Sequence, residues 1–287
     1  MQKACKKYPH FAEQYLKLKR AVELAGRSQS TLNNYARCLA HMVKHFKCSL
    51  LEIDEEQLLD YLQWLKNKHN TPSESYFKHT IYGLRFLYRQ YGIKQLLVAL
   101  PSLKRQKALP VVLSQQEVRV ILKTPKLLKH RLIIALLYGC GLRNFELCNL
   151  KIADVDLNRK MIHVRKGKGN KDRYVPIGEM LIRGIKQYIN AERPSSFLLL
   201  SNKAEQYTPR GIQWVMRQVR TESGIQKQLT AHALRHSYAT HLLEMGMDII
   251  SLKELLGHQA IQTTMVYLHV ARVGRKDTFS TLDKLYE

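Results

Sequence analysis

Apolar residues recur at steps of three and four along the first hundred residues, which is the period of an amphipathic helix. The clearest such stretch covers 32–46, a second follows Asp54, and a third begins after 71–73 and ends at Gly92. A further amphipathic stretch lies at 11–24. The pattern predicts a small helical bundle. The candidates to cap the clearest helix are Ser28, Ser30 and Thr31.

A change of composition then divides the chain. Residues 101–113 combine two prolines with three basic residues and contain no acidic residue, which is typical of a linker. Ser114 and Glu117 form a capping-box pattern that opens the next helix. We therefore predict a helical domain at 1–103, a basic linker at 104–113 and a second domain at 114–287.

One region of the second domain is patterned for strands. The segments 161–166 and 173–177 read as strands, and the glycines and Asn170 between them suit a hairpin turn. The rest of the domain is mostly patterned for helices. The predicted fold is therefore mainly α with a small antiparallel β element, and the second domain is of the α+β class.

The net charge narrows the choice of partners. The chain carries 47 Lys and Arg against 23 Asp and Glu, a formal charge of +24. A hydrophobic fraction of 45% provides a folded core and excludes a disordered polycation. Residues 1–100 carry 16 Lys and Arg against 8 acids, so the excess is not confined to one domain. We expect both domains to meet the same polyanion.

No stretch predicts insertion into a membrane. The longest uncharged apolar run, 132–142, is far shorter than a membrane-spanning helix. The first residues are basic but lack the apolar region of a signal peptide, so we expect a cytosolic protein. The five cysteines are odd in number and form no CxxC pair, which favours reduced, buried thiols over disulfides or a zinc site.

Basic residues recur on one face of the third predicted helix, at Lys78, Arg85 and Arg89, with Tyr82 among them. This stripe fits a surface that follows DNA phosphates, and it fits a solvated helix face equally well. With the basic residues of the linker, the candidates for DNA binding are Lys78, Arg85, Arg89, Lys104, Arg105 and Lys107.

Four short stretches of the second domain concentrate polar residues in apolar surroundings. In 139–147, Arg143 and Glu146 are three residues apart and can pair on a helix. Taken alone, such a pair is more typical of a structural salt bridge. In the hairpin, Lys168 lies between two glycines, where its ammonium can reach a phosphate oxygen. A solvated turn is the alternative for this lysine.

The third stretch, 230–241, predicts a helix with two faces. Its apolar stripe consists of Leu234, Tyr238, Leu242 and Met245. Another face carries His232, Arg235, His236 and Ala239. Zinc would use clustered histidines, but no Glu stands in an HExxH frame. Neutral donors beside a fixed cation near a helix start therefore favour a phosphate.

The fourth stretch places His258 directly after the helix stop Gly257, and Tyr267 nine residues further on. Spacing alone does not distinguish this tyrosine from a packing residue. The candidates to cap a short helix around it are Thr263 and Thr264.

Together, the four stretches resemble the tyrosine recombinase (phage integrase) family over nearly the whole chain. The matching segments are GLRNFEL at 141–147, KGKGNKDRYVPI at 166–177, HALRHSYATHLL at 232–243 and LLGHQAIQTTMVYLHV at 255–270. Their order and spacing agree as well as their content. The chain is most similar to compact Xer-like enzymes and to integron- or transposon-type integrases.

The resemblance implies a clamp around the scissile phosphate of DNA. Arg143 and Arg235 would bind its nonbridging oxygens, and Glu146 would support the first arginine. Two planar guanidinium groups can neutralise the charge that develops on these oxygens. The expected reaction therefore needs no metal and no other cofactor.

The resemblance also assigns the proton transfers. Tyr267 would attack as the nucleophile, and Lys168 would protonate the departing 5′ oxygen. His232 and His258 would hydrogen-bond the phosphate and assist proton transfer. The resulting 3′-phosphotyrosine conserves the energy of the phosphodiester bond, so strands can be rejoined or exchanged without ATP.

The architecture of the family implies a helical core-binding (SAM-like) domain and a catalytic domain that close on duplex DNA as a C-shaped clamp. Four protomers would assemble on two sites, each an inverted-repeat core, in the bacterial nucleoid. The C-terminal tail of each protomer, with Phe279, Leu282 and Tyr286, would dock on its neighbour; a frayed terminus is the alternative.

The expected function is site-specific recombination for integration, excision or resolution of DNA. A type IB topoisomerase-like nicking and closing activity would use the same six residues, but the two-domain size argues against it. A noncatalytic DNA-binding architectural factor is the other alternative. The intact set of catalytic residues argues against that reading.

Overall fold

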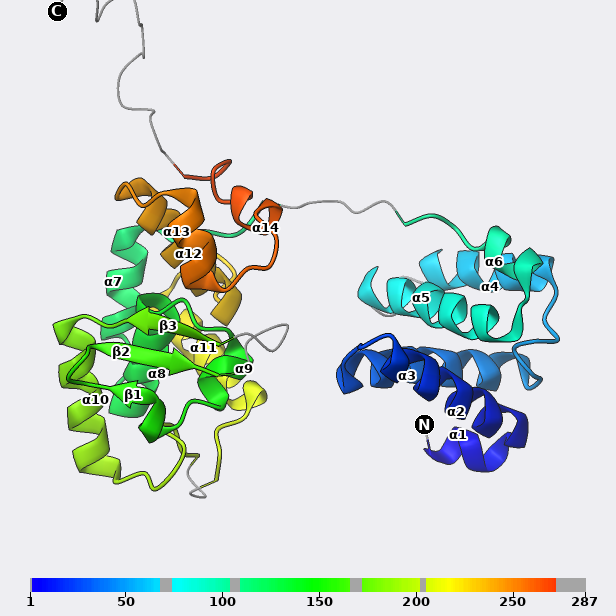
Figure 1. Ribbon diagram of the computed structural model, residues 1–287, viewed down its shortest axis with the longest axis horizontal. Coiled ribbons are helices and arrows are strands. Elements are labelled where there is room, and N and C mark those ends of the chain that lie inside the picture. Colours follow the sequence, from blue (N-terminus) through cyan, green and yellow to red (C-terminus); the bar gives the residue numbers. More distant parts are fainter. Residues whose placement is uncertain (1, 68–73, 104–108, 166–171, 202–204, 272–287) are drawn as a thin grey trace, which may run out of the picture. The chain divides into compact units, whose positions relative to one another are not determined.

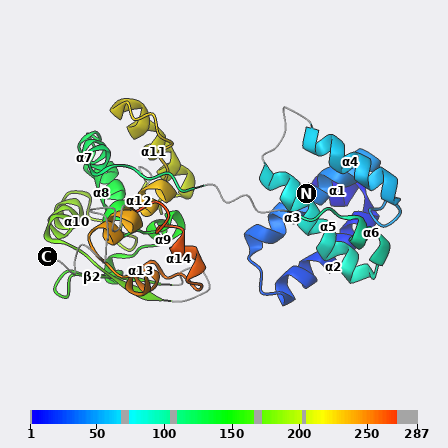
Figure 2. The same cartoon turned by 90° about the horizontal axis from the view of Figure 1, so that it is seen from above.

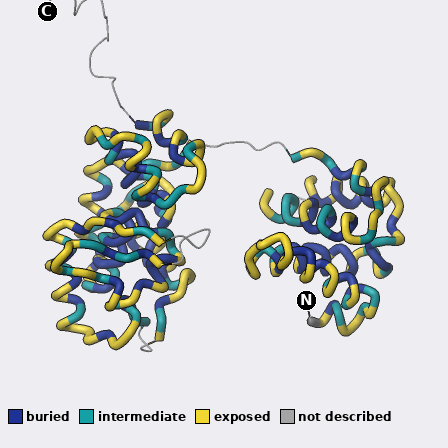
Figure 3. Tube along the Cα trace, in the orientation of Figure 1, coloured by how far each residue is buried: buried dark blue, intermediate teal, exposed yellow. Residues whose placement is uncertain are grey.

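The computed structural model describes residues 2–67, 74–103, 109–165, 172–201 and 205–271. The chain forms two compact units, Met1–Gln106 and Lys107–Glu287 (Figure 1). Each unit has its own hydrophobic core, and the buried residues line the interior of each unit (Figure 3). The division between the units falls inside the segment whose composition predicts a linker.

The first unit is a bundle of helices (Figures 1 and 2). Its described helices are α1 (Gln2–Lys7), α2 (Pro9–Leu24), α3 (Gln29–Phe46), α4 (Glu55–Asn67), α5 (Glu74–Tyr91) and α6 (Lys94–Ala99). Helices α3 and α5 approach closely at Gly83, where a Cβ would lie 3.3 Å from the Cβ of Tyr35. The missing side chain therefore lets the two helices pack together.

Local chemistry explains where these helices begin and end. The Ser28 side chain caps α3 by accepting a hydrogen bond from the backbone N–H of Thr31 at 3.3 Å. Gly92 follows α5 in the left-handed region, with φ +68°. The four helices that the hydrophobic pattern predicts are confirmed. The short helices α1 and α6 were not predicted, because six residues give little periodicity.

The second unit combines helices with one small sheet. Its described elements are α7 (Gln115–Lys123), α8 (Leu128–Gly139), α9 (Asn144–Cys148), the 3-10 helix η1 (Ile152–Asp154), β1 (Val155–Asp156), β2 (Met161–Val164), β3 (Arg173–Pro176), α10 (Glu179–Glu192), α11 (Pro209–Ser223), α12 (Ala231–Glu244), α13 (Ile249–Leu256) and α14 (Gln262–Met265). The capping box of Ser114 and Glu117 opens α7 as predicted.

The sheet is antiparallel, in the order β1-β2-β3. In the predicted hairpin, Met161 pairs with Pro176 and Val164 pairs with Arg173. Strand β1, which has two residues, was not predicted. The tip of the hairpin, 166–171, lies outside the described residues. The mainly helical fold with a small antiparallel sheet is confirmed.

Helix α12 packs against both α8 and α13, and most of its circumference is buried. The buried surface of α12 is therefore wider than the predicted apolar stripe. The last residue of that stripe, Met245, is 68% exposed because it lies past the end of the helix. All five cysteines are free thiols. Cys5 and Cys48 are only partly buried, which corrects the expectation that all would be buried. Among the described residues, no helix has the length and apolar character to cross a membrane.

Candidate active site

Three arginine side chains meet at the C-terminal end of α13. They come from β3, from α12 and from the residue that precedes α9. The last carbonyl groups of a helix lack intrahelical partners and carry partial negative charge, so they bind cations well. The bonds run from Arg173 Nε to the Leu255 carbonyl (2.9 Å), from Arg235 Nη2 to the Leu256 carbonyl (2.6 Å) and from Arg143 Nη2 to the Gly257 carbonyl (3.4 Å).

Glu146 joins two of these arginines. Its carboxylate accepts two hydrogen bonds from Arg173, at 2.9 and 2.7 Å, and one from Arg143 Nη1 at 2.6 Å. The backbone N–H of Arg143 also donates to this carboxylate, at 2.8 Å. The Glu146 side chain is 3% exposed. Burial alone would raise the pKa of this carboxyl, but the hydrogen bonds and charges of the two arginines lower it to about 2.

Gly141 holds Arg235 from the other side. The Gly141 carbonyl accepts a hydrogen bond from Arg235 Nη1. The backbone of Gly141 has φ +55°, and a Cβ at this position would lie 2.8 Å from Cε1 of Tyr238. Both facts favour glycine, since other residues are strained at this φ and would overlap the ring. The glycine of the GLR segment thus lets the chain pass close to α12 and present its carbonyl group.

His258 lies between the arginines and Tyr267. Its Nε2 is 3.2 Å from Arg235 Nη2, and its Nδ1 is 2.9 Å from the Oγ1 of Thr264. Because a guanidinium only donates, Nε2 accepts and Nδ1 carries the proton. The rings of His258 and Tyr267 are nearly parallel, with centroids 6.3 Å apart. The predicted capping role of Thr264 is wrong, because its hydroxyl contacts His258 and no side chain caps α14.

Tyr267 follows α14 and is 3% exposed. Its hydroxyl lies 3.1 Å from Nδ1 of His236. One turn earlier on α12, the exposed His232 stacks on His236, with ring centroids 6.3 Å apart. The tyrosine is therefore in contact with His236 of α12 at its hydroxyl and with His258 at its ring.

The histidines of the cluster are neutral at pH 7. Burial, together with the charges of neighbouring arginines, lowers the pKa of His258 to about 3. Burial and the neighbouring His232 and Arg235 lower the pKa of His236 to about 4. The pKa of His232 is also lowered, by partial desolvation of its ring and by the charges of Arg235 and Arg143, although part of the side chain is exposed. These rings can accept or donate a hydrogen bond without carrying charge.

Burial and neighbouring charges shift the pKa values of Tyr267 and Arg235. Burial raises the pKa of Tyr267, while the charges of Arg235 and Arg143 act to lower it. Burial and the charge of Arg143 lower the pKa of Arg235 to about 10, so this guanidinium stays charged at neutral pH. The phenol is thus protonated at rest, and its ionisation needs a proton acceptor as well as the cationic field.

The remaining predicted residues have varied positions. On α5, Lys78 pairs with Glu74, and Arg85 Nη2 donates to the Pro101 carbonyl at 2.9 Å. Arg89 is exposed. The other candidates, Lys104, Arg105, Lys107 and Lys168, lie outside the described residues.

Two residues of the cluster were not singled out from the sequence. Arg173 stands at the start of a strand, where a basic residue is ordinary, and only the fold brings it to Glu146. His236 was placed on the same face as His232, but its spacing gave no sign of the contact with Tyr267.

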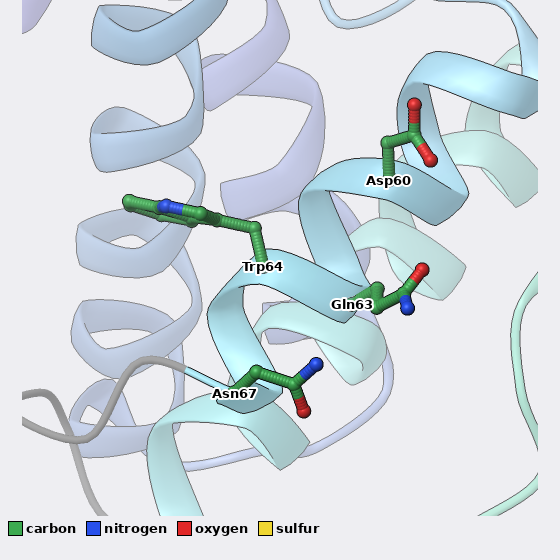
Figure 4. A pocket seen from close by; sticks show the side chains of 4 residues that line it. All are labelled: Asp60, Gln63, Trp64 and Asn67. Atoms are coloured by element: carbon green, nitrogen blue, oxygen red, sulfur yellow. The ribbon is translucent and has the colours of Figure 1, made fainter.

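Two hollows lie away from this cluster. In the second unit, a hollow of about 950 Å³ is bounded by α7, α8 and the start of α10. In the first unit, a hollow of about 430 Å³ is lined by Asp60, Gln63, Trp64 and Asn67, all from α4 (Figure 4).

Known proteins share both the sequence and the fold. Residues 111–273 match the phage integrase family, and residues 15–96 match the phage integrase N-terminal SAM-like domain. The chain is 36% identical over 255 residues to tyrosine recombinase XerA of Thermococcus onnurineus, which covers 87% of this chain and 88% of that protein. It is 31% identical over 277 residues to tyrosine recombinase XerD of Listeria innocua, which covers 88% of this chain and 92% of that protein.

Solved structures agree with this relationship. The crystal structure of XerA recombinase superposes with a TM-score of 0.53 at 26% identity, covering 96% of this chain and 97% of that one. The XerH recombinase in a post-cleavage complex with palindromic difH substrate shares the fold, with a TM-score of 0.70 at 22% identity over 95% of this chain and 84% of that one. The chain therefore belongs to the phage integrase family of tyrosine recombinases.

Proposed function

We propose that this chain is a site-specific recombinase that cleaves and rejoins DNA strands through a 3′-phosphotyrosine intermediate. The observation that carries the proposal is the convergence at the end of α13. There, two arginines from separate elements lie beside a neutral histidine, close to a buried tyrosine hydroxyl. The XerA and XerD relatives support this function by their names and by their coverage of the chain.

In this proposal, Arg143 and Arg235 bind the nonbridging oxygens of the scissile phosphate. The carbonyl groups of Gly141, Leu256 and Gly257 already fix the two guanidinium planes in the DNA-free protein. Little side-chain entropy is then lost when the phosphate arrives. Such preorganised donors stabilise the negative charge that grows on these oxygens in the transition state.

Cleavage is then an in-line exchange of one phosphoester for another. The bond from Tyr267 Oη to phosphorus forms as the bond from phosphorus to the 5′ oxygen breaks. We assign to Lys168 the proton that the 5′ oxygen gains, and to the exposed His232 a hydrogen bond to the phosphate. His258 orients Arg235 in the free protein and, by the family resemblance, assists proton transfer. A good acid at the leaving oxygen accelerates such a step by about 10²–10⁴.

The nucleophile is tested by Tyr267→Phe on a nicked suicide DNA that traps the covalent complex. The variant loses one hydroxyl, so folding and DNA binding persist while the covalent adduct disappears. Tyr238→Phe is the matched control, because this tyrosine is also buried in the same small core but serves packing. An adduct with Tyr267→Phe, or none with Tyr238→Phe, would contradict the assignment.

We further propose that the unit Met1–Gln106 binds the core site and closes with the catalytic unit around the duplex. Its contacts would be Lys78, Arg85 and Arg89 with the linker residues Lys104, Arg105 and Lys107. Arg89 is the sharpest test, because it is exposed. Arg89→Gln should weaken binding on all sequences and reduce the salt slope by about 1. Lys19→Gln, which removes another exposed basic charge from this unit, on α2 and paired with Glu23, should leave the slope unchanged.

The proposed assembly is a homotetramer on two inverted-repeat sites, with the C-terminal tail docked on the neighbouring protomer. The hollow between α7, α8 and α10 is a suitable acceptor, because leucines line it and a basic rim surrounds it. The tail carries apolar and acidic side chains that complement it. The rim residues are Arg119, Lys123, Arg131 and Arg183. The tail residues are Phe279, Leu282, Tyr286, Asp277, Asp283 and Glu287.

A chain that ends at Ala271 tests this assembly. It should bind a single site normally but lose the four-protomer complex on two sites, measured by native mass spectrometry. Met180→Glu, at the hollow, should have the same effect if the tail docks there, because the Met180 side chain is 81% exposed and its replacement does not disturb the core. Strand exchange between two labelled DNA sites distinguishes a recombinase from a nicking and closing enzyme. We place this activity in the cytosol, at the nucleoid.

A further inference from the structure

The hydroxyl of Tyr267 is in contact with a histidine to which no role has been given. Nδ1 of His236 lies 3.1 Å from Oη of Tyr267, and the two ring centroids are 5.6 Å apart. This distance is within the reach at which a side chain can take a proton. His236 is fixed by its place in α12, next to Arg235, so the contact is built into the same helix that carries the phosphate-binding arginine.

The surroundings of His236 leave it free to accept this proton. The charged and titratable groups that face it are Arg235 and His232 from α12 and Tyr267 itself, with His258 near the tyrosine ring. Burial, His232 and the charge of Arg235 lower the pKa of the ring to about 4, so Nδ1 is unprotonated at pH 7 and acts as a weak base that gains the proton only as Oη bonds to phosphorus. The other two histidines are less suited. His258 is engaged with Arg235 and Thr264, and His232 stacks on His236, whose Nδ1 is the atom that contacts the Tyr267 hydroxyl.

We propose that His236 is the general base that takes the phenolic proton of Tyr267 during DNA cleavage. The inference rests on the proposed function, because it assumes that Tyr267 is the nucleophile. As Oη bonds to phosphorus, Nδ1 gains the proton, and the departing 5′ oxygen gains one from the acid that we assign to Lys168. One positive charge thus moves from the acid to His236. In rejoining, the 5′ hydroxyl returns its proton to that acid, and His236 returns its proton to the phenolate.

Two substitutions separate proton transfer from simple positioning. In His236→Ala the base is absent, and in His236→Gln an amide oxygen can still accept the hydrogen bond without taking the proton. Both variants should form the covalent complex slower by about 10²–10⁴ under single-turnover conditions, with unchanged DNA affinity. If His236→Gln cleaves at the wild-type rate, the residue only positions the hydroxyl and the proposal is overturned.

The matched control is a second histidine–tyrosine pair, whose histidine also lies on α12 and whose tyrosine lies on α8. Nδ1 of His241 lies 2.9 Å from Oη of Tyr138. His241→Gln removes the same kind of ring and should leave the cleavage rate of the folded protein unchanged. A similar slowing in His241→Gln would mean that loss of a buried histidine, rather than loss of the base, causes the effect.

A chemical substitution of the nucleophile provides an independent readout. A ring-fluorinated tyrosine at position 267 is more acidic, so it depends less on a base. It should restore much of the rate in His236→Gln and little of it in Lys168→Ala. Equal rescue of both variants would overturn the proposal. The proposed function fails if the wild-type protein forms no adduct or if Tyr267→Phe still forms one. If both proteins behave as expected and His236→Gln cleaves at the wild-type rate, only the present inference fails.

Discussion

Replacement of Glu146 by Gln should destabilise the second unit and loosen Arg143 and Arg173 together. The carboxylate binds both Arg143 and Arg173 and is 3% exposed, while the Arg173 side chain is 8% exposed. Its pKa falls from an ordinary 4.5 to about 2. At about 1.4 kcal/mol per pKa unit, this corresponds to a contribution of about 3 kcal/mol to stability at neutral pH. That size agrees with the cost of about 3–5 kcal/mol for removing one partner of a buried ion pair.

The pH dependence of the unfolding free energy provides a second test of this prediction. A carboxyl whose pKa is lowered by folding stabilises the protein above its unfolded pKa, and this stability is lost as the pH falls toward the folded pKa. The difference in unfolding free energy between wild type and Glu146→Gln should therefore be full at pH 7. It should shrink from about pH 4.5 and vanish near pH 2.

The chain offers a convenient assay, because its two tryptophans lie in different units. Trp64 is in α4 and Trp214 is in α11, so Trp64→Phe leaves a fluorescence signal from the second unit alone. Urea unfolding in this background measures the Glu146→Gln effect. The matched control is Glu179→Gln, which breaks an exposed pair with Lys160 in the same unit. It should cost far less than Glu146→Gln, because water and salt screen an exposed pair.

If Glu146→Gln and Glu179→Gln lower the unfolding free energy equally at pH 7, the reasoning is refuted. Burial would then not determine how much an ion pair contributes to stability. Glu146→Gln should also slow covalent cleavage, because Arg143 loses the partner that orients it. A variant that is destabilised but cleaves at the wild-type rate would show that Glu146 supports the fold and not the site.

Three further outcomes follow from the proposed chemistry and from the packing. A bridging 5′-phosphorothiolate, whose thiolate leaves without a proton, should rescue Lys168→Ala by about 10² or more and leave Arg235→Ala impaired; equal rescue of both would contradict the division of roles. Cleavage should persist in excess chelator, and DNA affinity should fall with a slope of about −0.9 per contacted phosphate in the logarithm of the association constant against log salt; activity lost with chelator and restored by magnesium would refute the metal-free scheme. Gly141→Ala should lower the unfolding midpoint and the cleavage rate, because a Cβ would meet the Tyr238 ring and displace the carbonyl that binds Arg235; a fully active, stable variant would contradict the close approach.

Periodic patterns predicted the long helices because each of these helices buries one stripe of apolar side chains. The helix at 32–46 is an example, and so is the capping box at Ser114, where the side-chain chemistry is local. Short elements such as β1 were missed, because two residues carry no period and the strand exists only through its pairing with β2. The prediction that Thr264 caps a helix was wrong for a similar reason. Its hydroxyl contacts His258, six residues earlier, and the local sequence does not show this contact.

The site shows a similar division between local and long-range information. The motifs located Arg143 and Arg235 along the chain, but not the carbonyl groups that hold them. Arg173 and His236 depend on packing between β3, α12, α13 and α14, and no spacing within one segment encodes such contacts. Sequence reasoning therefore identified the groups expected to touch the phosphate and missed most of their supports.

The three carbonyl groups at the end of α13 make the length of this helix a structural parameter of the site. Each successive carbonyl binds a different arginine. Insertion or deletion of one residue within α13 would turn this end by about 100° and shift it by about 1.5 Å along the axis. All three guanidinium groups would then lose their acceptors at once, whereas a substitution on the exposed face of α13 would disturb none of them. This protein should therefore tolerate substitutions in α13 far more readily than insertions or deletions there.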